Sequence, residues 1–404
     1  MTLIPDIAAE HDALQAIRRD FHAHPETAFE EVRTAARVAE LLQGWGIEVH
    51  RGLGKTGLVG VLRGTGTAGS GRTIGLRADM DALPMTEYNS FAHASTIPGR
   101  MHGCGHDGHT TMLLGAAQYL SRHRDFGGTV HFIFQPAEEG GCGGARAMME
   151  DGLFARFPCD EVYGIHNMPG MPAGRFGFCA GPMMASSNRF DIVIKGTGGH
   201  AAMPEKVVDP IVIAAEMIGV LQTLVSRNNS PFDVAVLSIT QVHAGDAYNV
   251  IPEQAVIKGT VRAFSAEVLD RLEANLRRVA TTLPQVYGAS GELDFVRAYP
   301  ALINHAPQAG FAADVAESVF GPARVDRQIP PMSASEDFSF YLQAVPGSYV
   351  FLGNGDGGHR DSGVGPGPCE LHNPSYDFND ALLPIGATYW VRLVESFFAR
   401  TSAV

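Results

Sequence analysis

The chain of 404 residues is 45% hydrophobic, and its length exceeds what one hydrophobic core usually holds, so we expect two domains. Its 43 acidic and 30 basic side chains leave a formal net charge of -13, which argues against nucleic acid and anionic membranes as partners. The N-terminus lacks the pattern of a secretory signal and no apolar stretch has the length of a membrane span, so we expect a cytoplasmic protein.

The first 185 residues alternate helical and strand patterns. Apolar residues recur at helical spacing in residues 12–24, 30–46 and 109–123. Short apolar runs, each ending in polar or turn residues, predict strands at residues 56–62, 73–81, 129–136 and 161–167. This order predicts an α/β domain with a mixed, largely parallel sheet wrapped by helices, whose sites form beyond the carboxyl ends of the strands.

From about residue 186 the pattern changes to that of a smaller α/β sandwich. Its strands are predicted at residues 188–196, 233–245, 254–264 and 291–299, and its helices at residues 209–227 and 266–283. Further helix and strand patterns follow at residues 310–320, 348–353 and 381–400. We therefore predict one domain made of residues 1–185 and 300–404, with a second domain, residues 186–299, inserted into it.

The stretch MHGCGHDGHT, which starts at Met101, holds a cysteine and three histidines. Cys104 and His106 lie two positions apart between glycines, which let the backbone fold tightly and direct both side chains to one point. Thiolate and imidazole are favoured ligands of zinc and its divalent neighbours. A lone cysteine or histidine is better explained by core packing, but this density of donors predicts a metal site.

Two adjacent carboxylates, Glu138 and Glu139, follow the strand predicted at residues 129–136. Adjacent glutamates usually form a solvated pair, but these stand between a proline and a Gly-rich turn, at the sheet edge that the Cys/His loop also faces. One carboxylate can then bind metal while its neighbour accepts a proton from water. His166 at another strand end and His372 in a polar loop are weaker candidates on their own.

Eight motifs spread over nearly the whole chain carry a resemblance to a known family. They are RADMDALP, MHGCGHDGHT, FQPAEEGG, GIHNMPG, GGHAAMPE, NVIP, SASEDFSFYLQ and LHNPSYDFND. With them the chain resembles the hippurate hydrolase and indole-acetyl-amino-acid hydrolase branch of the dinuclear metallopeptidases, with aminoacylase and carboxypeptidase G as more distant relatives. The resemblance implies a metal-dependent hydrolase of N-acyl amino acids, with Glu138 as catalytic base. It implies five metal ligands, namely Cys104, His106, Glu139, His166 and His372.

Five ligands exceed the need of one tetrahedral ion, so we expect two divalent ions, of zinc, manganese, cobalt or nickel, with one shared ligand. In the wider family a carboxylate bridges the ions, and we infer that Cys104 takes that place, because a polarizable thiolate can bind two cations. Neighbouring polar groups would orient the ligands and select the histidine tautomers. These groups are Asp79, Asp81, His102, Asp107 and His109.

The inserted domain carries three candidate substrate-binding residues, His200, Asn249 and Arg262. In the family, the histidine that corresponds to His200 reaches from one subunit into the site of the other, so the resemblance implies a homodimer with the inserted domain as lid and dimerisation domain. Asn249 and Arg262 are polar groups beside strands that would hold the substrate carboxylate, Arg262 through paired hydrogen bonds. The chain departs from the family at Glu205, where histidine is common, and at Cys142.

Other functions could use the same residues. Cys104 could act as a nucleophile, with His102 or His106 as base, in a thiol amidase that needs no metal. The same metal centre could serve a dipeptidase or a carboxypeptidase. The chain could also be a non-catalytic metal-binding module, although the presence of Glu138 beside a full set of ligands argues against a decayed site.

Overall fold

The computed structural model describes residues 2–67, 71–360 and 362–400, which divide into two compact units. The first unit comprises Met1–Gly181, Ile303–Pro330 and Asp337–Val404, and the second comprises Pro182–Leu302 and Pro331–Glu336. The second unit is therefore an insertion into the sequence of the first. The insertion is predicted as residues 186–299, and the unit extends a few residues beyond both of these limits. The unit also includes Pro331–Glu336, which the prediction places in the first domain.

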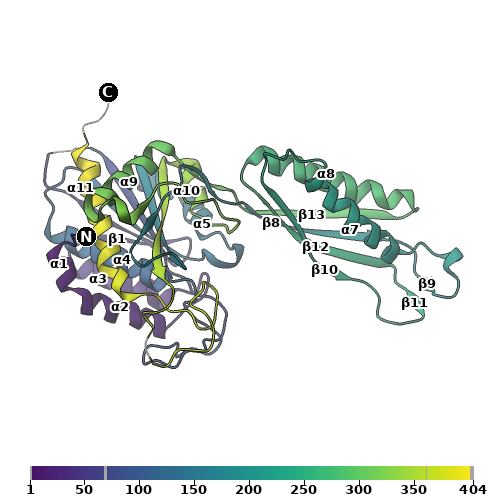
Figure 1. The fold of residues 1–404 in the computed structure, drawn as a ribbon, viewed down its shortest axis with the longest axis horizontal. Helices are drawn as coiled ribbons and strands as arrows, with labels where there is room; N and C mark the ends of the chain where they lie inside the picture. Colours follow the sequence, from purple (N-terminus) through teal and green to yellow (C-terminus); the bar gives the residue numbers. More distant parts are fainter. Residues whose placement is uncertain (1, 68–70, 361, 401–404) are drawn as a thin grey trace. The chain divides into compact units, whose positions relative to one another are not determined.

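An eight-stranded mixed sheet forms the middle of the first unit (Figure 1). Its strands are β1 (Glu48–Leu53), β2 (Gly57–Arg63), β3 (Thr73–Asp79), β4 (Thr129–Gln135), β5 (Glu161–Pro169), β6 (Phe176–Gly177), β15 (Val325–Asp326) and β16 (Gly347–Gly355). They lie in the order β1-β2-β4-β3-β5-β16-β6-β15, and the central strands β4, β3, β5 and β16 are parallel. The predicted mixed, largely parallel sheet is confirmed. Strand β1, which pairs antiparallel with β2, and the two-residue strands β6 and β15 are not predicted by the sequence.

Helices pack against this sheet and against one another (Figure 1). They are α1 (Pro5–Ala9), α2 (His11–Ala23), α3 (Val32–Gly44), α4 (His106–Arg122), α5 (Gly144–Glu150), α6 (Leu153–Arg156), α9 (Ala306–Phe320), α10 (Ser339–Ala344), α11 (Leu383–Ala399) and the short 3-10 helices η1 (Glu139–Gly141), η3 (Pro322–Arg324) and η4 (Asp380–Leu382). Helix α11 contacts α2, α4 and α9. Among the described residues, no helix has both the length and the apolar composition needed to cross a membrane. The cytoplasmic location stays a prediction.

Helix α4 is the buried centre of the first unit and carries the Cys/His motif at its start. It contacts β3, β4 and β5 as well as α11, so most of its residues are buried. A Cβ on Gly386 would lie 2.0 Å from Met112 Sδ, so a larger residue where α11 meets α4 would force the Met112 side chain to shift. The start of α4 is therefore held in place by packing on several sides.

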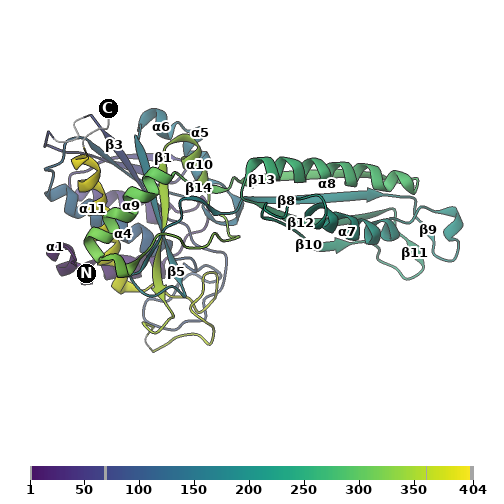
Figure 2. The ribbon, with the colours of Figure 1, turned by 45° about the horizontal axis from the view of Figure 1, so that its top comes forward.

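The second unit is a four-stranded antiparallel sheet with two helices packed on it (Figure 2). Its main elements are β8 (Ser187–Lys195), β10 (Ala235–His243), β12 (Gln254–Ala263), β13 (Ser290–Tyr299), α7 (Pro210–Ser226) and α8 (Ala266–Val286), with the shorter β9 (Gly199–His200), β11 (Val250–Ile251) and η2 (Pro204–Lys206). The short strands β7 (Gly181–Met184) and β14 (Leu302–Asn304) stand where the chain passes from one unit to the other. The strand order is β10-β12-β8-β13. Nearly every second residue of β12 is buried, so one face of the sheet packs on the helices. The predicted smaller α/β sandwich is confirmed.

Candidate metal centre

The loop before α4 brings Cys104 and His106 together. Gly105 between them has a left-handed backbone with a φ of 94°, and a Cβ there would lie 2.2 Å from Asn167 Nδ2. Only glycine fits such a turn. Both side chains are buried, and His106 is the first residue of α4. The glycine spacing of the motif therefore has the physical role that the sequence predicts for it.

Side chains from three other segments of the first unit meet this loop. His166 on β5 places Nε2 3.4 Å from Cys104 Sγ. His372 Nε2 lies 3.2 Å from Oε1 of Glu139, which follows β4. His372 reaches this position with a left-handed backbone, at a φ of 61°, which is uncommon for a residue other than glycine. Donors from four separate segments thus share one region.

The possible ligand atoms form overlapping groups, in each of which all atoms lie within 4.8 Å of one another. Three of these groups are Cys104, His106 and His166; Cys104, Glu139 and His372; and His106, Glu138 and Glu139. The structure therefore brings together the five predicted ligands and the predicted base. Cys104 belongs to two of the groups, which is the arrangement expected of a ligand shared by two ions.

The donor set fits divalent metal ions. Within the described part of the chain, the buried His106 Nε2 has no hydrogen-bond partner. A buried polar nitrogen without a partner is costly unless something binds it. An ion held jointly by Cys104, His106 and His166 would bind that nitrogen, and the mixture of thiolate, imidazole and carboxylate suits zinc and its neighbours.

Asp81 contacts two of the predicted ligands at once. One carboxylate oxygen lies 3.1 Å from His106 Nδ1, and the other accepts the backbone N–H of Glu139 at 2.9 Å. Burial opposes protonation of His106, but Asp79 and Asp81, with a smaller effect of Glu139, raise the pKa of His106 to about 10. The two contacts of Asp81, with His106 and with the backbone of Glu139, are those of a residue that orients ligands.

A buried chain of hydrogen bonds supports the backbone of Cys104. His109 Nδ1 lies 2.7 Å from Asp79 Oδ1, and His109 Nε2 accepts the backbone N–H of Asn167 at 2.9 Å, so the donor proton is on Nδ1. Asn167 Nδ2 in turn donates to the Cys104 carbonyl oxygen at 2.6 Å. Burial raises the pKa of Asp79, but Arg77 Nη1 at 2.6 Å and nearby histidines keep it well below its usual value. Arg77 and Asn167 are not predicted from the sequence as residues of the site.

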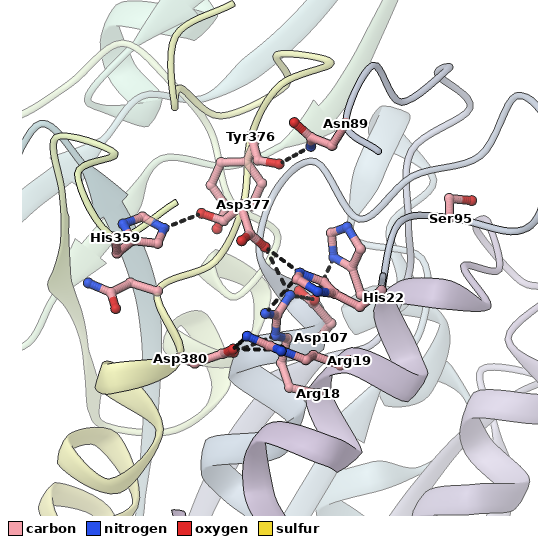
Figure 3. A network of polar contacts seen from close by, with 12 residues as sticks. Arg18, Arg19, His22, Asn89, Ser95, Asp107, His359, Tyr376, Asp377 and Asp380 are labelled. Atoms are coloured by element: carbon pink, nitrogen blue, oxygen red, sulfur yellow. Dashed lines mark hydrogen bonds and ion pairs between the residues drawn. The ribbon is translucent and has the colours of Figure 1, made fainter. Parts of the chain in front are cut away.

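A second buried network attaches the start of α4 to α2 (Figure 3). Asp107 Oδ2 lies 2.9 Å from His22 Nδ1 and 3.5 Å from Arg18 Nη1. Arg18 also donates to Asp377 at 3.0 Å and to Asp380 at 2.7 Å. Burial opposes the charge on His22, but its hydrogen bond with Asp107 is one of the contacts that raise its pKa to about 10. Asp107 thus anchors the helix that carries the motif, with its carboxylate directed to α2.

His102 has surroundings different from those expected of a residue that orients a ligand. Its ring is buried, and neither ring nitrogen has a hydrogen-bond partner among the residues that the structure describes. Burial lowers the pKa of His102 to about 4, so the ring is neutral at physiological pH. A role in orienting ligands stays a prediction for this residue.

The surroundings of Cys104 do not suit a thiol nucleophile. Burial, together with Glu139, Glu138 and Asp79, raises the pKa of Cys104 well above its usual value. Burial also lowers the pKa of His166, the imidazole that faces the thiol, well below its usual range. A reactive cysteine needs a lowered pKa, so the metal-free thiol amidase is disfavoured, whereas a bound cation would stabilise the thiolate.

The three predicted substrate-binding residues lie in the second unit. His200 is exposed, and its Nδ1 accepts the backbone N–H of Ala202 at 3.1 Å. Arg262 is partly buried and donates from Nη1 to Ser335 Oγ at 3.1 Å. Asn249 is exposed. Their roles toward a substrate stay predictions.

Comparisons with known proteins agree on one family. A model of peptidase family M20/M25/M40 matches residues 75–396. Hippurate hydrolase of Campylobacter jejuni is 42% identical over 97% of this chain and 98% of that protein, and an IAA-amino acid hydrolase of Arabidopsis thaliana is 38% identical over 97% and 87%, respectively. The solved structure of a dinuclear metal-binding peptidase of family M20 from Bacillus subtilis is 34% identical, with a TM-score of 0.81, over 97% of this chain and 99% of that one.

Proposed function

The chain belongs to peptidase family M20/M25/M40, and from this we propose that it is a metal-dependent amidohydrolase that cleaves N-acyl amino acids into a carboxylic acid and a free amino acid. The relatives that match almost its whole length include hydrolases of hippurate and of IAA-amino acids. The observation that carries the proposal is the convergence, beside Glu138, of Cys104, His106, Glu139, His166 and His372.

Two divalent ions would be held at this centre. Cys104, His106 and His166 would hold one ion, and Cys104, Glu139 and His372 would hold the other, because these are the groups whose ligand atoms lie together. The donors suit zinc, manganese, cobalt or nickel. When bound, such ions lower the pKa of water and polarise a carbonyl oxygen.

Glu138 is the proposed general base. Its carboxylate lies within 4.8 Å of ligand atoms of His106 and Glu139 and is almost fully buried. In this position Glu138 would take a proton from the attacking water and return it to the amide nitrogen as the C–N bond breaks. Its neighbour Glu139 faces His372, so the two adjacent carboxylates would have different tasks.

The substrate class follows from the relatives, which act on an acyl group linked to an amino acid. Such a substrate has a free carboxylate, and we propose His200, Asn249 and Arg262 as its contacts. Burial lowers the pKa of Arg262, whose side chain is partly desolvated. A partly desolvated guanidinium binds a carboxylate more strongly than an exposed one does.

An assay with a panel of substrates tests this function. We expect the metal-reconstituted protein to release free amino acid from hippurate, N-acetyl amino acids or indole-acetyl amino acids faster than from unblocked dipeptides. A chelator should abolish this activity, and one of the four candidate ions should restore it. Cleavage of dipeptides or of peptide C-termini alone would favour a dipeptidase or carboxypeptidase. Activity that survives complete metal removal would refute the metal centre, and no hydrolysis with any ion would favour a non-catalytic module.

The second unit also supports the proposal of a homodimer. In the described chain, β10 lies at the edge of the sheet and pairs with β12 alone. Val236 and Val242 on this strand are exposed, and the adjacent Phe232 is 94% exposed. An exposed apolar edge strand has unpaired backbone groups and is a template for pairing with another chain. A two-fold dimer would pair two copies of β10.

Sedimentation equilibrium measures this association. We expect a mass of twice the 43.1 kDa of one chain. Lysines at Val236 and Val242 should give monomers, because charge on an edge strand opposes pairing. Val286→Lys is the matched control, since Val286 is 79% exposed but lies on α8. A monomeric native protein, or a lysine pair that leaves the mass unchanged, would contradict the dimer through β10.

A further inference from the structure

The residue before the proposed base has an unusual backbone. Ala137 has a φ of 52°, in the left-handed region that side chains with a Cβ disfavour, and it is fully buried. Its conformation determines the direction in which the chain continues to Glu138 and Glu139. A strained backbone of this kind persists only where its surroundings hold it.

The buried carboxyl of Glu31 holds this backbone. Its Oε1 accepts the N–H of Ala137 at 2.9 Å and the N–H of Phe29 at 3.0 Å, and its Oε2 accepts the hydroxyl of Thr56. On the other side, the Ala137 carbonyl oxygen accepts the N–H of Gly144 at 2.9 Å. Both polar groups of the Ala137 backbone are therefore bonded.

The hydrogen bonds of Glu31 reach residues at or next to other positions with a strained backbone. The described chain has four residues other than glycine with positive φ, and three of them are Phe29, Lys55 and Ala137. Glu31 bonds to the backbone of Phe29 and Ala137 and to the side chain of Thr56, which follows Lys55. One side chain from the segment before α3 thus bonds to the backbone of two strained residues and to the side chain that follows the third.

We propose that Glu31 is a positioning residue that holds Ala137 in its left-handed conformation and so aims Glu138 at the metal centre. This inference rests on the proposed function, since it takes Glu138 as the base. The acceptor oxygens of Glu31 carry the role, and its negative charge does not. Burial raises the pKa of Glu31 to about 7, which agrees with a group that acts through its acceptors.

Four variants test the proposal, namely Glu31→Gln, Glu31→Met, Ala137→Gly and the double variant Glu31→Met/Ala137→Gly. Glutamine keeps an acceptor oxygen and should retain kcat. Methionine removes the acceptors, so kcat should fall by about 10²-fold, the cost of misplacing a catalytic group by about 1 Å, while KM and metal content stay unchanged. Glycine at 137 should be near neutral alone and should restore most of the lost kcat in the double variant, because glycine adopts positive φ without help.

Glu161→Met is the matched control. Glu161 is another buried glutamate, which accepts the hydroxyl of Tyr163 and a hydrogen bond from Arg400. Its replacement should lower stability without changing kcat, and Ala137→Gly should not compensate for it. If Glu31→Met does not fold, Glu31→Asp takes its place, since a carboxyl one methylene shorter cannot span the same donors.

The stability of the same variants toward unfolding gives a second test, which needs no substrate. In denaturant titrations, we expect Ala137→Gly to stabilise the Glu31→Met protein more than the native protein. In Glu31→Met, the hydrogen bond that offsets the strain of the positive φ at Ala137 is lost, and glycine removes that strain. A native enzyme without amidase activity would refute the proposed function and leave this coupling measurable. If the two substitutions are coupled in stability but Glu31→Met has an unchanged kcat, the positioning role is overturned and the proposed function is not. The same holds if the double variant is no faster than Glu31→Met.

Discussion

Glu138→Gln is expected to lower kcat by about 10²–10⁴-fold, the usual contribution of a positioned proton transfer, while the metal content stays that of the native enzyme. Glutamine has nearly the same shape but cannot accept the proton of the attacking water. Among the described residues, neither ligand group that contains Cys104 includes Glu138, so the loss of Glu138 should leave the ligand set intact. Steady-state kinetics and elemental analysis of the same sample measure both quantities.

Glu139→Gln provides the contrast for this result. Glu139 lies one position further along the chain, but its carboxylate is grouped with Cys104 and His372. We expect this variant to lose metal as well as activity. A Glu138→Gln enzyme that keeps its metal and most of its kcat would remove Glu138 from the mechanism, and equal metal loss in both variants would contradict the division of tasks.

Cys104→Ala should release both metal ions and abolish hydrolysis. Cys104 belongs to both of the groups proposed to hold an ion, so its removal would take one donor from each proposed ion. Loss of a group that merely supports a ligand costs about 10–100-fold in metal affinity, and loss of a shared ligand should cost more. Metal affinity can be measured by competition with a coloured chelator. It should rise with pH in the native protein, because burial raises the pKa of the thiol that must lose its proton.

Cys142→Ala is the control for this variant. Cys142 is an exposed thiol in the Gly-rich turn after the glutamates, and it belongs to no ligand group among the described residues. We expect its replacement to leave metal affinity and kcat unchanged. Two ions retained by Cys104→Ala at native affinity would show that Cys104 is not the shared ligand.

The sequence by itself determined the class of fold and the kinds of donor in the site. Helical and alternating spacing of apolar residues encodes which side of an element is buried, so α4 and the central strands were predicted close to their observed positions. The glycines around Cys104 and His106 and the position of Glu138 and Glu139 after β4 are also local features. They place these donors at the same edge because parallel strands end there together.

Only the tertiary structure decided which distant polar groups complete and support the site. His372 carries no local signal that pairs it with Glu139, and nothing in the sequence near Asn167 or Glu31 shows that they bond to the backbone of Cys104 and Ala137. Local spacing reports burial, but a hydrogen bond needs two atoms within about 3 Å, and that distance depends on how separate segments pack. For this reason the donors were predictable one by one, while the contacts that hold them in place became visible only in the folded chain.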